Sequence, residues 1–330
     1  MPAPCPLAPE YTTWTLHGIA FFSIPINVLG FYLVMYKSPG IAKYKYCVFY
    51  VQAATFITEL IMTVISPAYF FFPILAGYDT TELLSAVISE HLLFAIWTFF
   101  LCSELPALMS CFIYRHNSSE NMRTKQNSRI TKKIMFSLSQ IFPFAVFFGF
   151  YKSKISREEA YQYLSKNYPQ CLFWLDSPAL NIYDWKANSW IAITGIGALV
   201  AVVFIAGYGF SLAICTMLLL HELRSHMSSQ TFRLHQNALI ALSLQVIIPS
   251  VLIILPLFIC FWVVITDNID KQELAANSIG LIACHSVCST MVMIFANSRY
   301  RQVIRSWVPW GKKDPKEVVS VGPTSMMTAT

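Results

Sequence analysis

Seven long apolar stretches constrain what this chain can fold into more than any other feature of its sequence. A helix needs about 20 consecutive apolar residues to cross the roughly 30 Å hydrocarbon core of a bilayer. We place such stretches at about residues 14–36, 47–66, 91–114, 134–151, 190–220, 237–264 and 275–295. Each should be helical, because a backbone in lipid must satisfy its own hydrogen bonds. The predicted fold class is an all-α membrane protein, a seven-transmembrane helix bundle.

Composition also favours a membrane protein over a soluble one. Only 12% of the 330 residues are charged and 56% are hydrophobic, whereas soluble domains carry roughly 25% charged residues. So few charges could not coat that much apolar surface in water. We expect one receptor-like domain over residues 1–306, which ends in an amphipathic helix at about 300–310. Residues 311–330 are expected to form a disordered cytoplasmic tail.

Lysine and arginine predict the orientation, because they are enriched in cytoplasmic loops. The loops after the first, third and fifth stretches and the C-terminal tail together hold 17 of these residues, and the other connections hold 6. This split predicts an N-terminus outside and a C-terminus in the cytosol. The formal net charge of +6 then reflects topology, and no nucleic-acid partner is expected.

Three short motifs are typical of one receptor family by their order and placement. Residues 66–67 (SP) and 72–78 (FPILAGY) follow the second stretch, residues 235–249 (HQNALIALSLQVIIP) lead into the sixth, and residues 297–301 (NSRYR) end the seventh. Over about residues 10–306 the chain resembles nematode serpentine chemoreceptors of the Str superfamily, closest to classes H and I. Like them, it lacks the Asp-Arg-Tyr and Asn-Pro-x-x-Tyr motifs of other G-protein-coupled receptors.

The resemblance implies a receptor without catalytic activity or cofactor. It would bind a small-molecule cue from outside and activate a heterotrimeric G protein, in the plasma membrane of sensory cilia on neurons. The cue would bind among the outer halves of the second, third, fifth, sixth and seventh spans, under the outer loop, and apolar lining would favour a small, largely hydrophobic compound. Whether the receptor dimerises stays open.

The cytosolic face is expected to be basic. The candidates for facing the G protein are Arg115, His116, Arg224, Arg233 and Arg301. The same charges would also attract anionic membrane lipids.

Proline kinks are expected in the sixth span. Pro249 and Pro256 lie within it, and proline removes an intrahelical hydrogen bond. The resemblance implies that this span moves on activation, so the two kinks are hinge candidates, although static bends are more common.

Three polar side chains are expected near the middle of the bilayer, namely Asn27, Glu59 and Glu104. Each lies 10 to 14 residues from a cytosolic Lys or Arg, or about 15–21 Å along a helix. They could form one cluster, which would be either an ion or proton site or switch or a neutral clamp between helices. We favour the clamp. Because no Lys or Arg lies inside a span, both glutamates are expected to be protonated.

Other candidates lie toward the outside or stand alone in a span. Glu90 and His91 at the outer mouth of the third span, and His285 in the seventh, could contact a ligand. A solvated helix end or a hydrogen-bonded interior histidine is the more common role.

Cys5 and Cys171 are the only cysteines placed outside, and an oxidising exterior favours their pairing. No residue set has metal-ligand spacing, so no metal is expected.

Three other classes of protein remain as alternatives. A transporter or proton-coupled carrier would use Glu59, Glu104 and His285 as a relay. A ligand-gated channel of the insect olfactory type would place its N-terminus inside, which the loop charges oppose. A membrane-embedded hydrolase or transferase ranks last, because the sequence has no HExxH, paired aspartate or phosphate-binding signature.

Overall fold

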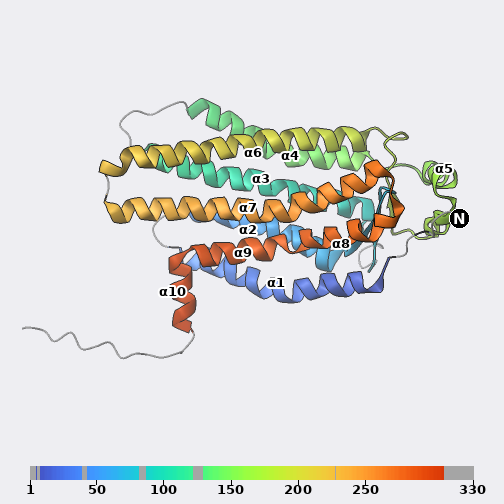
Figure 1. Ribbon diagram of the computed structural model, residues 1–330, viewed down its shortest axis with the longest axis horizontal. Helices are drawn as coiled ribbons and strands as arrows, with labels where there is room; N and C mark the ends of the chain where they lie inside the picture. Colours follow the sequence, from blue (N-terminus) through green and yellow to red (C-terminus); the bar gives the residue numbers. More distant parts are fainter. Residues whose placement is uncertain are drawn as a thin grey trace, which may run out of the picture.

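The protein forms a bundle of long helices that run side by side (Figure 1). The computed structural model describes residue 5 and residues 8–38, 43–81, 87–121, 129–226 and 228–307. The long helices are α1 (Glu10–Tyr36), α2 (Tyr44–Leu60, extended by a π-helical turn at Ile61–Ile65), α3 (Glu90–Glu120), α4 (Arg129–Lys152), α6 (Trp190–Glu222) and α7 (Ser229–Thr266). A seventh span consists of α8 (Gln272–Ala283) and α9 (His285–Ala296). Within the described residues, seven helical segments are long and apolar enough to cross a membrane, which confirms the predicted fold.

The outward faces of the helices are suited to lipid. Ile193, Ile196, Leu199 and Val203 of α6 are all more than half exposed. A stripe of this kind would be an aggregation hazard in water, whereas acyl chains would cover it in a bilayer. The helix α3 lies inside the bundle, where it packs against α2, α4 and α6.

The seventh span differs from the single helix that we expected. It breaks at Cys284, whose amide donates to the carbonyl of Leu281 three residues back (3.1 Å). The imidazole of His285 bonds the carbonyl of Ile282. A side chain that inserts into the hydrogen-bond ladder is a known cause of a helix break.

The sixth span is continuous. Both Pro249 and Pro256 fall inside α7, and α7 curves along its length (Figure 1). The helix also extends eight residues before the predicted start at residue 237.

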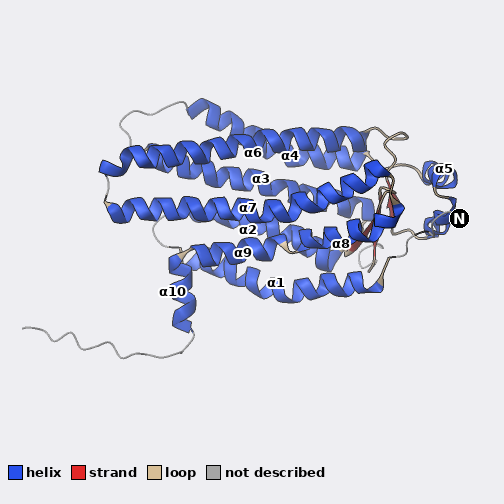
Figure 2. Ribbon diagram, in the orientation of Figure 1, coloured by secondary structure: helices blue, strands red, loops and turns tan. Residues whose placement is uncertain are grey.

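A cap of short elements covers one end of the bundle (Figure 2). We did not predict its strands, β1 (Ala68–Phe71), β2 (Ala76–Asp79) and β3 (Leu180–Ile182), which pair antiparallel in the order β1-β2-β3. A cis Phe72–Pro73 peptide lies between β1 and β2. The helix α5 (Arg157–Asn167) and the 3₁₀ segment Pro169–Asp176 complete the cap.

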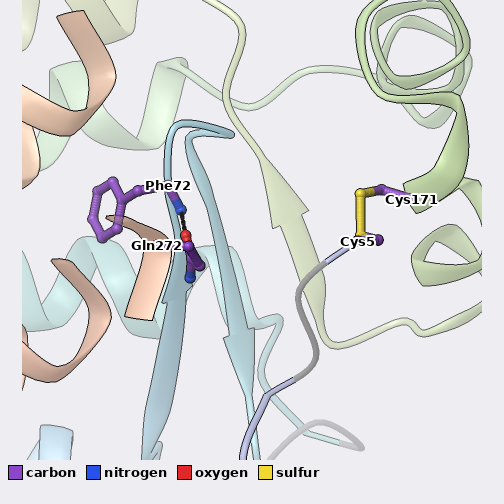
Figure 3. The surroundings of a disulfide bond; sticks show 4 residues. All are labelled: Cys5, Phe72, Cys171 and Gln272. Carbon is purple, nitrogen blue, oxygen red and sulfur yellow. Dashed lines mark hydrogen bonds between the residues drawn. A yellow bond between two sulfur atoms is a disulfide. The ribbon is translucent and has the colours of Figure 1, made fainter. Parts of the chain in front are cut away.

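A disulfide bond joins Cys5, in the segment before α1, to Cys171 in the 3₁₀ segment of the cap (Figure 3). Their Cα atoms lie 5.2 Å apart. The bond ties the start of the chain to a loop 166 residues away.

The opposite end of the bundle carries α10 (Ser298–Trp307), which turns away from the bundle axis (Figure 1). Residues 308–310, the predicted end of the amphipathic helix, and the predicted disordered tail at 311–330 lie outside the described residues. We call this end the α10 end and the other the capped end.

Candidate functional site

A cavity of about 180 Å³ lies directly beneath the cap. We call it the aromatic cavity, and its lining consists of Phe70, Phe72, Leu75, Ala76, Phe94, Trp97, Thr98, Phe150, Tyr183 and Ile191. The hydroxyl of Thr98 already donates to the carbonyl of Phe94 (2.7 Å). Burial raises the pKa of Tyr183 far above its usual range, so the phenol stays neutral. The cavity therefore favours neutral, apolar contents.

The two candidate residues at the mouth of α3 are buried rather than solvated, with Glu90 4% and His91 2% exposed. Both ring nitrogens of His91 have partners: Nδ1 lies 3.1 Å from the Tyr183 hydroxyl and Nε2 lies 3.0 Å from the Tyr151 carbonyl. The ring also stacks on Phe150. His91 thus holds two walls of the aromatic cavity in place and does not line it.

One side chain connects the cavity wall to the seventh span. Gln272, at the start of α8, accepts a hydrogen bond from the amide of Phe72 (Figure 3). Its Nε2 donates to the carbonyl of Phe70 (2.9 Å). We had not singled out Gln272, because a lone glutamine at a helix start carries no distinguishing signal in the sequence.

A buried polar network lies midway along the bundle and joins α1, α2 and α9. The Asn27 amide nitrogen donates to Glu59 (3.4 Å), and Ser23 donates to the same carboxylate. The Asn27 oxygen accepts from Gln52 (2.8 Å) and Thr290 (2.5 Å). Sequence analysis singled out Asn27 and Glu59 but missed the other three, because small polar residues in a span reveal no partner until the helices are packed.

Glu104 has a different direct partner from the one that we expected. Its Oε1 lies 2.7 Å from Nε2 of His285, which is fully buried, and no hydrogen bond joins Glu104 to Asn27 or Glu59 in the described part of the chain. The expectation for Glu104 considered only Lys and Arg as partners and so left out His285. His285 also lies within electrostatic range of Glu59, so the pair sits beside the polar network and links α3 to the break in span seven.

The α10 end holds a second, larger cavity of about 420 Å³. Of the five candidate G-protein contacts, Arg115 and Arg301 line it. The other three do not: His116 lies 3.1 Å from the Thr216 hydroxyl on α6, while Arg224, just after α6, and Arg233, near the start of α7, are exposed. Among the described residues, no three His, Cys, Asp or Glu side chains could together hold a metal ion.

Comparison with known proteins identifies the family. The family model described as "Serpentine type 7TM GPCR chemoreceptor Sri" matches residues 4–304. The chain belongs to this family. Both the family and the seven-helix fold are those of G-protein-coupled receptors rather than enzymes, so this Sri-family protein is a multi-pass membrane protein of the receptor type.

Solved structures support the same fold. The crystal structure of squid rhodopsin is similar over 92% of this chain and 83% of that chain, with a TM-score of 0.53 at 12% sequence identity. No curated protein matches the Sri-family chain.

Proposed function

We propose that this Sri-family receptor binds a small, neutral, largely hydrophobic cue in the aromatic cavity and activates a heterotrimeric G protein at the α10 end. The observation that carries the proposal is the aromatic cavity itself. It is an apolar space covered by the cap, and the hydrogen bonds of Gln272 connect its wall to the seventh span. We further infer a nematode receptor of the Str superfamily, of class H or I, in the ciliary membrane of sensory neurons.

The volume of the cavity limits the size of the cue. An engineered cavity of about 150 Å³ lined by aliphatic and aromatic side chains holds benzene. The aromatic cavity, at about 180 Å³, therefore suits a compound of roughly 6–10 non-hydrogen atoms, such as a substituted benzene or a short ketone. Charged cues are disfavoured, because the apolar lining has no charged group to offset the free-energy cost of desolvating them.

A chain of contacts offers a route from the cue to the other end. Phe70 and Phe72 line the cavity, and Gln272 bonds both of their backbones at the start of α8. Span seven then breaks at Cys284, where His285 contacts Glu104 of α3. A cue that shifts the β1–β2 hairpin would thus shift α8 relative to the break.

We infer that the cap faces outside. The split of basic residues places the N-terminus there, and a disulfide bond between Cys5 and Cys171 suits an oxidising compartment. A small N-terminal tag should be labelled on intact cells. Label that appears only after permeabilisation, on protein that has reached the plasma membrane, would contradict this orientation.

Filling the cavity tests the proposed cue site. Ile191 lines the aromatic cavity, whereas Ile193 on the same helix is 57% exposed toward lipid. In cells that carry a G-protein dissociation sensor, a panel of neutral volatiles of 6–10 non-hydrogen atoms should activate the wild type. Ile191→Trp should weaken the best response at least tenfold, and the matched Ile193→Trp should not. Equal responses in both variants would exclude this cavity as the cue site.

The carrier alternative would need a path for ions or substrate past Glu104 and His285. Neither residue lines the aromatic cavity or the cavity at the α10 end. Flux across the membrane that disappears in Glu104→Gln would favour the carrier over the receptor.

A further inference from the structure

The charged side chains that line the cavity at the α10 end are all positive. Its lining includes five cationic side chains, those of Lys37, Lys45, Arg115, Arg299 and Arg301, and no aspartate or glutamate. They come from the end of α1, the start of α2, the last turns of α3 and the start of α10, so the tertiary structure gathers charges that are far apart in the sequence. We call this space the basic cavity.

The five cations are not neutralised by the rest of the described chain. Lys45 lies over the ring of Tyr46 (5.3 Å) and Arg115 over the ring of Tyr44 (3.8 Å). None of the five has a carboxylate within ion-pair distance in the parts of the chain that the structure describes. Like charges held around one cavity repel each other, so a multivalent anion in the cavity would relieve the repulsion.

We propose that the basic cavity binds a polyphosphate, as the headgroup of a bisphosphorylated inositol lipid or as a free inositol polyphosphate. A phosphate monoester carries about −1.5 to −2 charges at pH 7, so two or three of them match five cations. A single peptide carboxylate would neutralise only one. The proposal rests on the proposed orientation, in which the α10 end faces the cytosol.

The polar lining suits such a headgroup. Arginine binds phosphate oxygens in a two-pronged geometry, and two of the five cations, Arg299 and Arg301, stand on the first turns of α10. Asn237 and Asn297 also line the cavity, and their side-chain amides can bond the hydroxyl groups of an inositol ring. The Ser38 hydroxyl is already bonded to that of Tyr300 (2.5 Å).

The surroundings favour the lipid as the source. Trp307, at the end of α10, is half exposed and its ring lies 5.8 Å from that of Tyr32 on α1. Aromatic side chains of this kind collect at the level of lipid headgroups. A headgroup in the basic cavity could therefore keep its acyl chains in the adjoining bilayer.

Direct binding tests the proposal on the full-length receptor in nanodiscs of phosphatidylcholine. The probe is a fluorescent, short-chain phosphatidylinositol bisphosphate. The triple variant Lys37→Gln, Lys45→Gln and Arg299→Gln should bind it on the order of 100-fold more weakly, at about fivefold for each charge removed. These three residues are outside the set proposed to face the G protein.

A matched control removes three charges from the same end outside the cavity. Lys43, Lys133 and Arg305 are exposed and do not line the basic cavity, so changing all three to Gln should weaken binding less than fivefold. Equal losses in the two triple variants, or no binding to the wild type, would overturn the proposal.

Two competitors identify the occupant. If free inositol trisphosphate displaces the probe at concentrations as low as those of unlabelled lipid, the site takes the soluble polyphosphate. If only the lipid displaces it, the site takes the headgroup in the membrane.

Failure of this inference can be distinguished from failure of the proposed function. A receptor that activates the G protein in response to a cue but binds no probe refutes the polyphosphate site alone. A receptor that binds the probe but responds to no cue on the panel leaves the site intact and refutes the proposed function.

Discussion

The contact between Glu104 and His285 should be worth about 1–3 kcal/mol of coupling between α3 and span seven. Their separation of 2.7 Å is in the range of charge-assisted hydrogen bonds, which are roughly twice as strong as neutral ones. Interhelical hydrogen bonds in membrane proteins couple by about 0.6 kcal/mol on average and about 1.7 kcal/mol at most. Doubling these values gives the expected range.

A double-mutant cycle measures this coupling. Glu104→Leu leaves the His285 ring without its partner, and His285→Phe keeps a ring but removes both nitrogens. Each single variant should be less stable than the wild type. The double variant should be more stable than the sum of the two single changes predicts, by about 1–3 kcal/mol.

Thermal unfolding followed by a thiol-reactive dye provides the assay, because Cys111 and Cys260 are free and buried and become reactive only on unfolding. At about 2–4 °C for each kcal/mol, the coupling corresponds to roughly 2–12 °C of non-additivity in Tm. The control cycle pairs Glu104→Leu with His17→Phe, because His17 bonds the Thr63 carbonyl. Additive shifts in both cycles would refute the claim that Glu104 and His285 connect the two helices.

Three further outcomes are expected in the cap and the cavity wall. Gly77→Ala would place a Cβ 2.7 Å from the Phe94 ring, so the ring must move; we expect a cost of about 1–3 kcal/mol in thermal unfolding and a weaker cue response, and no change in either would contradict the tight packing. Hydrogen bonds from the Ser156 amide and hydroxyl lower the pKa of Glu159 below its usual 4.5, so they stabilise α5 fully above about pH 4.5 and are lost as the pH falls through the lowered pKa. Hydrogen exchange of the α5 amides, corrected for intrinsic rates, should therefore accelerate on acidification in the wild type, and a similar acid step in Glu159→Gln would refute this cause. Cys5→Ser should destabilise the cap by about 2–5 kcal/mol, the range measured when a disulfide is removed from a small secreted domain; cap amides that exchange no faster would show that the bond is dispensable.

Much of the fold was predictable because membrane insertion is a local property. Whether a stretch such as residues 190–220 spans the bilayer depends on its own length and apolar content, and the structure has a helix there, α6. The break in span seven was not predictable in this way. It involves an interaction between His285 and the backbone of Ile282, and no breaking residue such as proline marks the position.

The cap also escaped prediction, for a different reason. The strands β1 and β2 are four residues each, and β3 is three. The segment at 68–77 contains an uninterrupted apolar run rather than an alternating pattern, and such a short run does not distinguish a strand from the end of a helix. Pairing of β2 with β3 joins segments about 100 residues apart, which no local pattern encodes.

The sequence by itself determined the number of spans and which polar residues fall within them. Only the tertiary structure decided which polar groups meet. Glu104 and His285 are 181 residues apart, and the cations of the basic cavity come from three separate parts of the chain. The physical reason is that burial of apolar side chains in a bilayer depends on each segment alone. A hydrogen bond between helices, or the field inside a cavity, depends on how whole helices pack together.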